Sequence, residues 1–126
     1  MVRFLVLMAG ILGGTSVAAG AFASHALRGS LSERALEIFE TAARYQMAHA
    51  LALGLVAVLM MQGGVQTIAP LTVAGIAFLA GIAIFSGSLY ALSLTDSRIL
   101  GAITPLGGVA FLIGWVALGW AGWQWR

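Results

Sequence analysis

Three long stretches of this sequence contain no Asp, Glu, Lys or Arg: residues 4–27, 45–95 and 99–125. A helix needs about 20 apolar residues to cross the hydrocarbon core of a bilayer. The first and the third stretch therefore hold one membrane span each. The middle stretch is long enough for two spans, because Gln62-Gly63-Gly64 and then residues 67–70, which end in proline, supply a break where the chain can turn. The pattern predicts four transmembrane helices.

Composition supports a membrane location and excludes several other classes of protein. With 61% hydrophobic and 8% charged residues, the chain has too little polar surface to coat a soluble globule, and its 126 residues suit a single domain, 1–126. The absence of cysteine excludes disulfides, iron–sulfur clusters and thiol redox chemistry of the chain's own. Six arginines, spread along the sequence, give a net charge of +2, which argues against a nucleic-acid patch and suits anchoring at a membrane surface.

Glycine and proline set the expected ends of the spans. Gly29 suits a left-handed residue that closes the first helix after Arg28. Pro70 and Pro105 are each expected in the first turn of a span, where a missing amide hydrogen costs little, with Thr104 as the cap before Pro105. The spans are therefore expected at about 4–28, 45–62, 70–94 and 105–125.

The residues between the first two spans, 31–44, form an amphipathic pattern. Ser30-Leu31-Ser32-Glu33 is typical of a capping box that starts a helix. Charged side chains then follow one helical face and apolar side chains follow another. This segment either extends the second span as one long helix or bends near residues 41–45 and lies along the interface. The expected architecture is all-α: a four-helix transmembrane bundle with an amphipathic helical segment between the first and second spans.

Small residues recur at helical spacing inside the spans. Gly10 and Gly14 begin a stripe on the first helix that continues to His25, and Gly107 and Gly114 belong to a similar stripe on the last helix. Small residues let membrane helices approach closely enough for packing to hold them together. These four glycines are therefore expected to be helix-packing positions, and His25 is expected to face a neighbouring helix.

Hydroxyl groups gather in the outgoing part of the third span, in the segment FSGSLYAL. Ser86, Ser88 and Tyr90 are expected there to bond backbone carbonyls or to cross to another helix. Adhesion within the bundle is the interpretation of these residues that the pattern favours.

Four segments together cover most of the chain: AGAFASHAL, ALEIFETAARYQMAHALAL, FSGSLYALSL and LGAITPLGGVAFLIGW. They resemble the small membrane proteins grouped as domain of unknown function 423. The resemblance implies a helical protein of the bacterial inner (plasma) membrane and brings no established activity. Ser24 departs from the family pattern, which usually has a glycine there. The positions to which the resemblance points are His25, Phe39-Glu40-Thr41, Arg44-Tyr45-Gln46, His49, Ser86-Gly87-Ser88, Tyr90 and Thr104-Pro105.

Arginines gather near the expected start of the second span. Arginine binds phosphate in a forked geometry, so Arg28, Arg34 and Arg44 are candidates for holding an anionic lipid. Glu40 lies one helical turn before Arg44, in the favourable order for a pair, although exposed pairs chiefly keep a helix face solvated. The neighbouring tyrosine and glutamine are expected at the level of the interface. The candidate lipid or partner contacts are Arg28, Arg34, Glu40, Arg44, Tyr45 and Gln46.

His25 and His49 are the candidates for cofactor binding, because a histidine within a membrane span is a functional candidate by default. Joint haem ligation or quinone contact requires the bent second helix, since an unbroken helix puts His49 about 27 Å from its start at Leu31. The favoured interpretation is that His49 faces the bundle, with Tyr45 or a polar group of another helix in hydrogen-bond reach. No metal or haem iron then joins the two histidines.

Three hypotheses for the function follow. No nucleophile, base and orienting acid occur together at a suggestive spacing, so the sequence predicts no enzyme. The leading hypothesis is a non-enzymatic accessory or interaction protein, without cofactor, that contacts lipid headgroups, a larger membrane complex or further copies of itself. One alternative is a redox-linked module that holds haem or quinone between His25 and His49. Another is a small transporter, which ordinarily needs an ionisable residue near mid-membrane.

Overall fold

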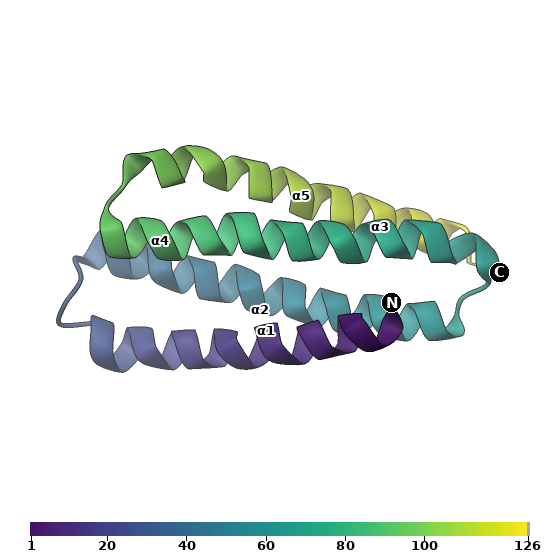
Figure 1. Cartoon of the computed structure of the whole chain (residues 1–126), viewed down its shortest axis with the longest axis horizontal. Coiled ribbons are helices and arrows are strands. Elements are labelled where there is room, and N and C mark those ends of the chain that lie inside the picture. Colours follow the sequence, from purple (N-terminus) through teal and green to yellow (C-terminus); the bar gives the residue numbers. More distant parts are fainter. Residues whose placement is uncertain (126) are drawn as a thin grey trace.

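Four helical rods form the molecule, and they run antiparallel with both termini toward the same end (Figure 1). The computed structural model describes residues 1–125. Each rod is long and apolar enough to cross a membrane, which confirms the all-α class and the expected number of four such helices. The elements are α1 (Val2–Phe22) continued by the π-helical turn η1 (Ala23–Leu27), α2 (Glu33–Gln62), α3 (Val65–Gly81) continued by η2 (Ile82–Ser86) and α4 (Gly87–Thr95), and α5 (Arg98–Trp123).

The second rod is one unbroken helix from Glu33 to Gln62. Its cap is Ser32, whose side chain accepts a hydrogen bond from the amide of Ala35, rather than the box that begins at Ser30. Of the two alternatives for residues 31–44, the structure has the long helix: residues 33–44 form the first turns of α2, and no separate helix lies between the first two rods of the described chain. The chain does not bend near residues 41–45.

The helix ends differ from the expected ends, because prolines lie inside helices. Pro70 lies within α3 and Pro105 lies within α5, which begins at Arg98. A membrane helix tolerates such prolines when neighbouring groups satisfy the freed carbonyls. Thr104 is not a cap, since its hydroxyl donates to the carbonyl of Leu100 inside α5. No glycine of the described chain has a positive φ, so Gly29 does not close a left-handed turn; Asp96, with φ of 54°, does so after α4.

The close contacts between helices lie along the seam where α5 meets α3 and η2. A Cβ atom at Gly107 would lie 2.7 Å from the Cα atom of Phe85, and a Cβ atom at Gly114 would lie 2.5 Å from the ring of Phe78. The backbone of Phe85 and the ring of Phe78 therefore occupy space that only glycine leaves free. Phe78 is fully buried and belongs to the main core.

The small-residue stripe of α1 does not pack within the chain, contrary to expectation. Nothing lies within 4 Å of a Cβ atom built on Gly10 or Gly14, and His25 is exposed in η1. The helix packs chiefly on α2, and it turns a different face inward, on which Leu5, Ser16 and Ala23 are buried. Small residues often mark contacts between membrane helices, but the contact face of this helix carries Leu5 and Ser16 instead.

Replacing Gly107 by alanine should destabilise the protein, whereas the same change at Gly10 should not. The new methyl at 107 would press on the backbone of Phe85, and overpacking of this kind costs about 1–3 kcal/mol. At Gly10 the methyl meets open space and alanine favours the helix. Thermal unfolding midpoints of the two variants in one detergent check this expectation. Equal midpoints would show that the seam has been assigned to the wrong face.

The arginines predict that the η1–α2 and α4–α5 connections face the cytoplasm. Arg28, Arg34, Arg44 and Arg98 belong to that end, against Arg3 at the end with the termini and Arg126, which lies outside the described residues. By the positive-inside rule the termini should then lie outside. Alkaline phosphatase fused to the C-terminus should be active, and a C-terminal green fluorescent protein that fluoresces instead would reverse the orientation.

Candidate functional site

Buried polar side chains form a layer that links all four rods. Each has a hydrogen-bond partner, and no buried side-chain nitrogen or oxygen in the described residues is left unsatisfied. In a bilayer this bonding is required, because no water is present to replace a missing partner. The members of this layer are Ser16, Gln46, His49, Ser86, Ser88 and Thr104.

Gln46 is the centre of this polar layer. Its Nε2 donates to the carbonyl of Leu12 and to Oγ1 of Thr15, both at 2.8 Å, and its Oε1 accepts from the hydroxyl of Tyr90 at 3.0 Å. The side chain is 6% exposed. One amide thus connects α1, α2 and α4. The structure therefore places Gln46, a candidate lipid or partner contact, with its side chain inside the bundle.

Hydroxyl groups on either side of α2 bond its backbone. Ser16 of α1 donates to the carbonyl of Ala43 at 2.7 Å, and Ser86 of η2 donates to the carbonyl of Ala42 at 3.0 Å. Ser88 and Thr104 share a hydrogen bond of 2.7 Å between α4 and α5. The predicted cross-helix role of Ser86, Ser88 and Tyr90 is confirmed.

His49 is 5% exposed and both of its ring nitrogens are engaged. Its Nδ1 lies 2.7 Å from the carbonyl oxygen of Tyr45, and the indole N–H of Trp115 donates to its Nε2 at 3.2 Å. A carbonyl accepts only from an N–H, so this arrangement requires the neutral tautomer with the proton on Nδ1. The ring also stacks on Phe111, with centroids 3.5 Å apart. The prediction that His49 faces the bundle with a polar partner is confirmed.

His25 and His49 lie at different depths. His25 belongs to η1, at the end where α2 begins, while His49 lies about 24 Å along α2 from Glu33 at 1.5 Å per residue. The structure therefore does not bring the two histidines to one ligand. A cavity of about 470 Å³ does lie beside His49, between α2 and α5, with Tyr45 and Trp115 in its wall. The alternative of haem or quinone held between His25 and His49 required a bent second helix, and α2 is unbroken.

The charged candidates lie at the end opposite the termini. Arg28, Arg34 and Arg44 are exposed, and Glu40 is half-buried. The guanidinium of Arg44 donates to Oγ1 of Thr41 at 3.2 Å. Tyr45, 45% exposed, packs its ring on Phe85 with centroids 4.6 Å apart.

Sequence reasoning missed two residues of these sites. Trp115 bonds His49, and an indole N–H inside a bilayer needs such a partner, which is the signal that its position in a span offered. Arg98 lines a cavity together with Arg34, although the two are far apart in sequence. The only signal for Arg98 was its place as a lone arginine between two apolar stretches.

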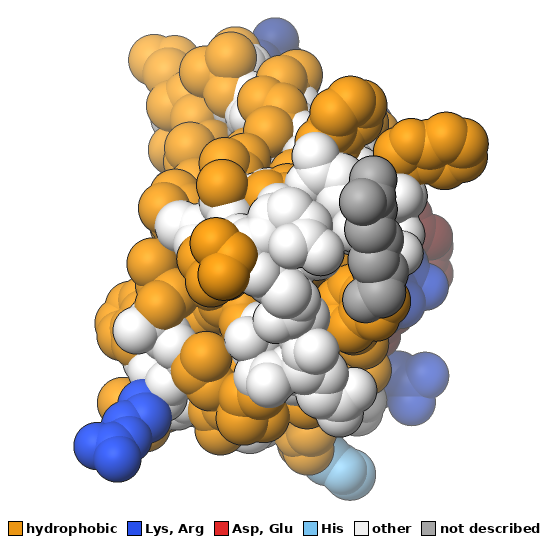
Figure 2. All heavy atoms as spheres, turned by 90° about the vertical axis from the view of Figure 1, so that its right-hand side faces the viewer, with side chains coloured by type: hydrophobic (Ala, Val, Ile, Leu, Met, Phe, Trp, Pro, Cys, Tyr) orange, Lys and Arg blue, Asp and Glu red, His pale blue; other side chains and the backbone are white. Residues whose placement is uncertain are grey.

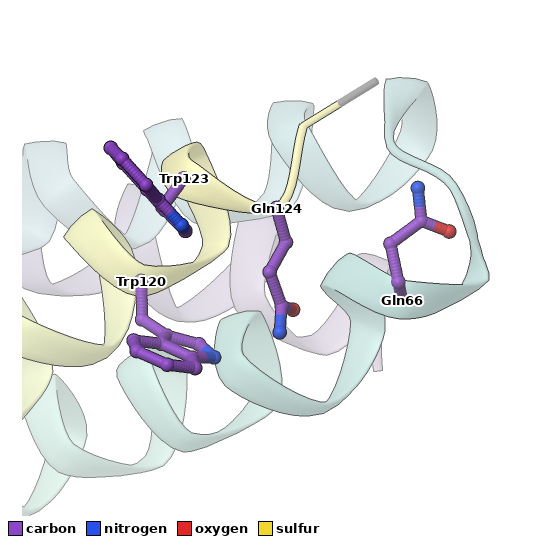
Figure 3. Close-up of a pocket in the computed structure, with 4 residues that line it drawn as sticks. All are labelled: Gln66, Trp120, Trp123 and Gln124. Carbon is purple, nitrogen blue, oxygen red and sulfur yellow. The ribbon is translucent and has the colours of Figure 1, made fainter.

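The end that holds the termini is built differently. It presents mostly hydrophobic and uncharged polar side chains (Figure 2). A cavity of about 610 Å³ there is lined by two indole rings of α5, an amide of α3 and the amide of the residue after α5: Trp120, Trp123, Gln66 and Gln124 (Figure 3). With its amide turned to donate to the carbonyl of Gln66 at 2.7 Å, Gln124 also accepts from the indole N–H of Trp120 at 2.9 Å. Such a group is typical of an aromatic belt at a membrane interface.

Comparison with known proteins matches the chain to small membrane proteins of bacteria. Residues 19–108 match the family model described as Protein of unknown function (DUF423). The UPF0382 membrane protein YwdK of Bacillus subtilis is 47% identical over 103 residues, which are 82% of each chain. A UPF0382 membrane protein of Haemophilus influenzae is 41% identical over 116 residues, covering 92% of this chain and 90% of the relative. No solved structure matches.

Gln46→Met should lower stability by about 1–2 kcal/mol, because it leaves the Tyr90 hydroxyl without its acceptor and removes the two bonds that Gln46 donates to α1. The matched control is Gln62→Met, at the exposed far end of the same helix. Unfolding in detergent measures both changes. If the two variants unfold alike, Gln46 does not connect the helices as described.

Proposed function

The chain belongs to the DUF423 family of small membrane proteins, and we propose that it is a non-enzymatic accessory protein whose charged end contacts the headgroups of membrane lipids. Lipid is the partner that this proposal favours over a larger membrane complex. The proposal rests on how charge is divided between the two ends of the bundle.

The one-sided placement of charge is the observation that carries the proposal. All acidic residues and four of the arginines belong to the end formed by η1, the start of α2 and the α4–α5 connection. Arginine binds phosphate with two parallel N–H donors, and every phospholipid headgroup carries a phosphate. The arginines Arg28, Arg34, Arg44 and Arg98 are all exposed.

The net charge of this end decides how it can bind lipid. This end carries four arginines and four carboxylates, so its net charge is zero. The carboxylates are those of Glu33, Glu37, Glu40 and Asp96. A long-range field that gathers anionic lipid is therefore not expected. Contact must come from individual arginines that reach single phosphates.

The interior of the bundle supports a non-enzymatic role. The buried polar groups of the described residues are already bonded to one another or to backbone. A general base or nucleophile needs a free lone pair beside a substrate. His49, the strongest candidate, uses its Nδ1 proton on Tyr45 and its Nε2 lone pair on Trp115. These bonds favour adhesion over chemistry.

Protein purified in a mild detergent should retain phospholipid through this end. The double change Arg28→Gln with Arg44→Gln should lower the phosphorus retained per protein, because two forked donors are lost. Glu37→Gln, an exposed change on the same end, should not lower it. Phosphorus analysis and mass spectrometry of the purified protein make the measurement. If the double variant retains as much phosphorus as the unchanged protein, the proposal of lipid contact is wrong. A protein partner that copurifies in a fixed ratio in place of lipid would instead support a role in a membrane complex.

A further inference from the structure

A cavity of about 460 Å³ opens between the start of α2 and the α4–α5 connection. This volume falls within the range of small-ligand pockets, roughly 300–1,000 Å³. Arg34 and Ile38 line it from α2, Leu92 from α4, and Asp96, Arg98 and Gly101 from the connection and the first turn of α5.

The turn at Asp96 brings the two arginines to this cavity. Asp96 adopts φ of 54° and ψ of 23°, a left-handed conformation that ends α4 and lets α5 begin at Arg98. Arg34 lies in the first turn of α2, two residues after the cap Ser32. Because α4 packs against both α2 and α5, the first turns of α2 and α5 flank the same space.

The charge of the cavity is positive although the charge of this end is balanced. Two guanidinium groups face one carboxylate, that of Asp96, among the residues that line it. The N-terminus of α5 adds to this charge, because the side chain of Ser97 makes no capping hydrogen bond to its first amides. The cavity therefore favours an anion, and Asp96 is the one group in its wall that opposes it.

The wall also has an apolar part, made by Ile38 and Leu92. A free phosphate ion would leave this part exposed to water. A lipid headgroup would place its phosphate on the arginines and the glycerol with the upper acyl chain on the apolar side chains. Basic pockets between transmembrane helices near the interface are known to suit such headgroups.

We propose that Arg34 and Arg98 bind the phosphate of an anionic lipid headgroup in this cavity. This inference rests on the proposed function and narrows it, since it names one site and one lipid class at the charged end. A zwitterionic headgroup carries a cationic group next to its phosphate, and the two arginines repel that group. The site thus selects phosphatidylglycerol over phosphatidylcholine.

The test uses the full chain in a neutral detergent with short-chain lipids. Dihexanoyl phosphatidylglycerol should raise the unfolding midpoint in a saturable way, while dihexanoyl phosphatidylcholine and inorganic phosphate should do so much less. Arg34→Gln and Arg98→Gln should each weaken the apparent affinity about tenfold, as expected for loss of one charge-assisted contact. Arg3→Gln, the same change at the opposite end, should leave the affinity unchanged.

A gain of affinity gives a second readout that a folding defect cannot imitate. Asp96→Asn removes the opposing carboxylate, and asparagine tolerates the left-handed conformation of this position. Phosphatidylglycerol should therefore bind more tightly to Asp96→Asn than to the unchanged protein. An unchanged or weaker affinity would overturn the placement of the phosphate in this cavity.

The remaining outcomes separate this inference from the broader proposal. If phosphatidylglycerol and inorganic phosphate raise the unfolding midpoint equally, and Arg34→Gln abolishes both effects, the cavity binds free phosphate. That result would overturn the assignment of a lipid to it. If Arg28→Gln and Arg44→Gln weaken binding as much as Arg98→Gln does, headgroup contact is spread over the charged end. The cavity is then not the binding site, while the proposed function stands. Equal responses to both lipids would overturn the selectivity.

Discussion

The amide of Gln46 makes three hydrogen bonds, and the position of the first helix depends on them. α1 packs chiefly on α2, and lipid provides no hydrophobic drive that would press the two together. The bonds from Gln46 to Leu12 and Thr15, with the bond from Ser16 to Ala43, therefore set how far α1 slides along α2. The same amide accepts from Tyr90, so α4 is aligned to the same level.

The other half of the bundle is held by shape. Phe78 fills the space beside Gly114, and Phe111 fills the space beside Gly81, so each of α3 and α5 inserts a ring where its neighbour has no side chain. Contacts of this kind are made of dispersion forces, which act only at close range. The bundle thus combines two forms of adhesion: polar bonds hold α1 to α2, and interlocked rings, together with the Ser88–Thr104 hydrogen bond, hold the third rod to α5. The bonds from Trp115 to His49, from Tyr90 to Gln46 and from Ser86 to Ala42 join the two halves.

The number of spans was readable from sequence because charge is so costly in a bilayer that its absence marks each crossing. Helix ends were less readable, since Pro105 suggests a start in water but is tolerated inside a membrane helix. Gln46 follows Arg44 by two positions, which suggests a residue at the membrane boundary. On a helix that spacing is about 200°, which places the two residues on nearly opposite faces. Helical periodicity therefore predicts that Gln46 points inward if Arg44 points outward. Only the three-dimensional structure shows that Arg34 and Arg98 lie at one cavity, because no local sequence pattern relates residues on different helices.

The π-helical turn η2 changes the direction in which the residues after it point from the axis of the third rod. A turn with i to i+5 bonding is wider than an α-helical turn, so the residues that follow it are rotated about the axis relative to an uninterrupted helix. Upstream, Phe78 meets α5; downstream, Tyr90 meets α2. A family member that lost one residue between 82 and 86 would keep its hydrophobic length and still cross the membrane. Its hydroxyls would nevertheless point to the wrong neighbours, so this stretch should resist length variation more than any hydropathy profile indicates.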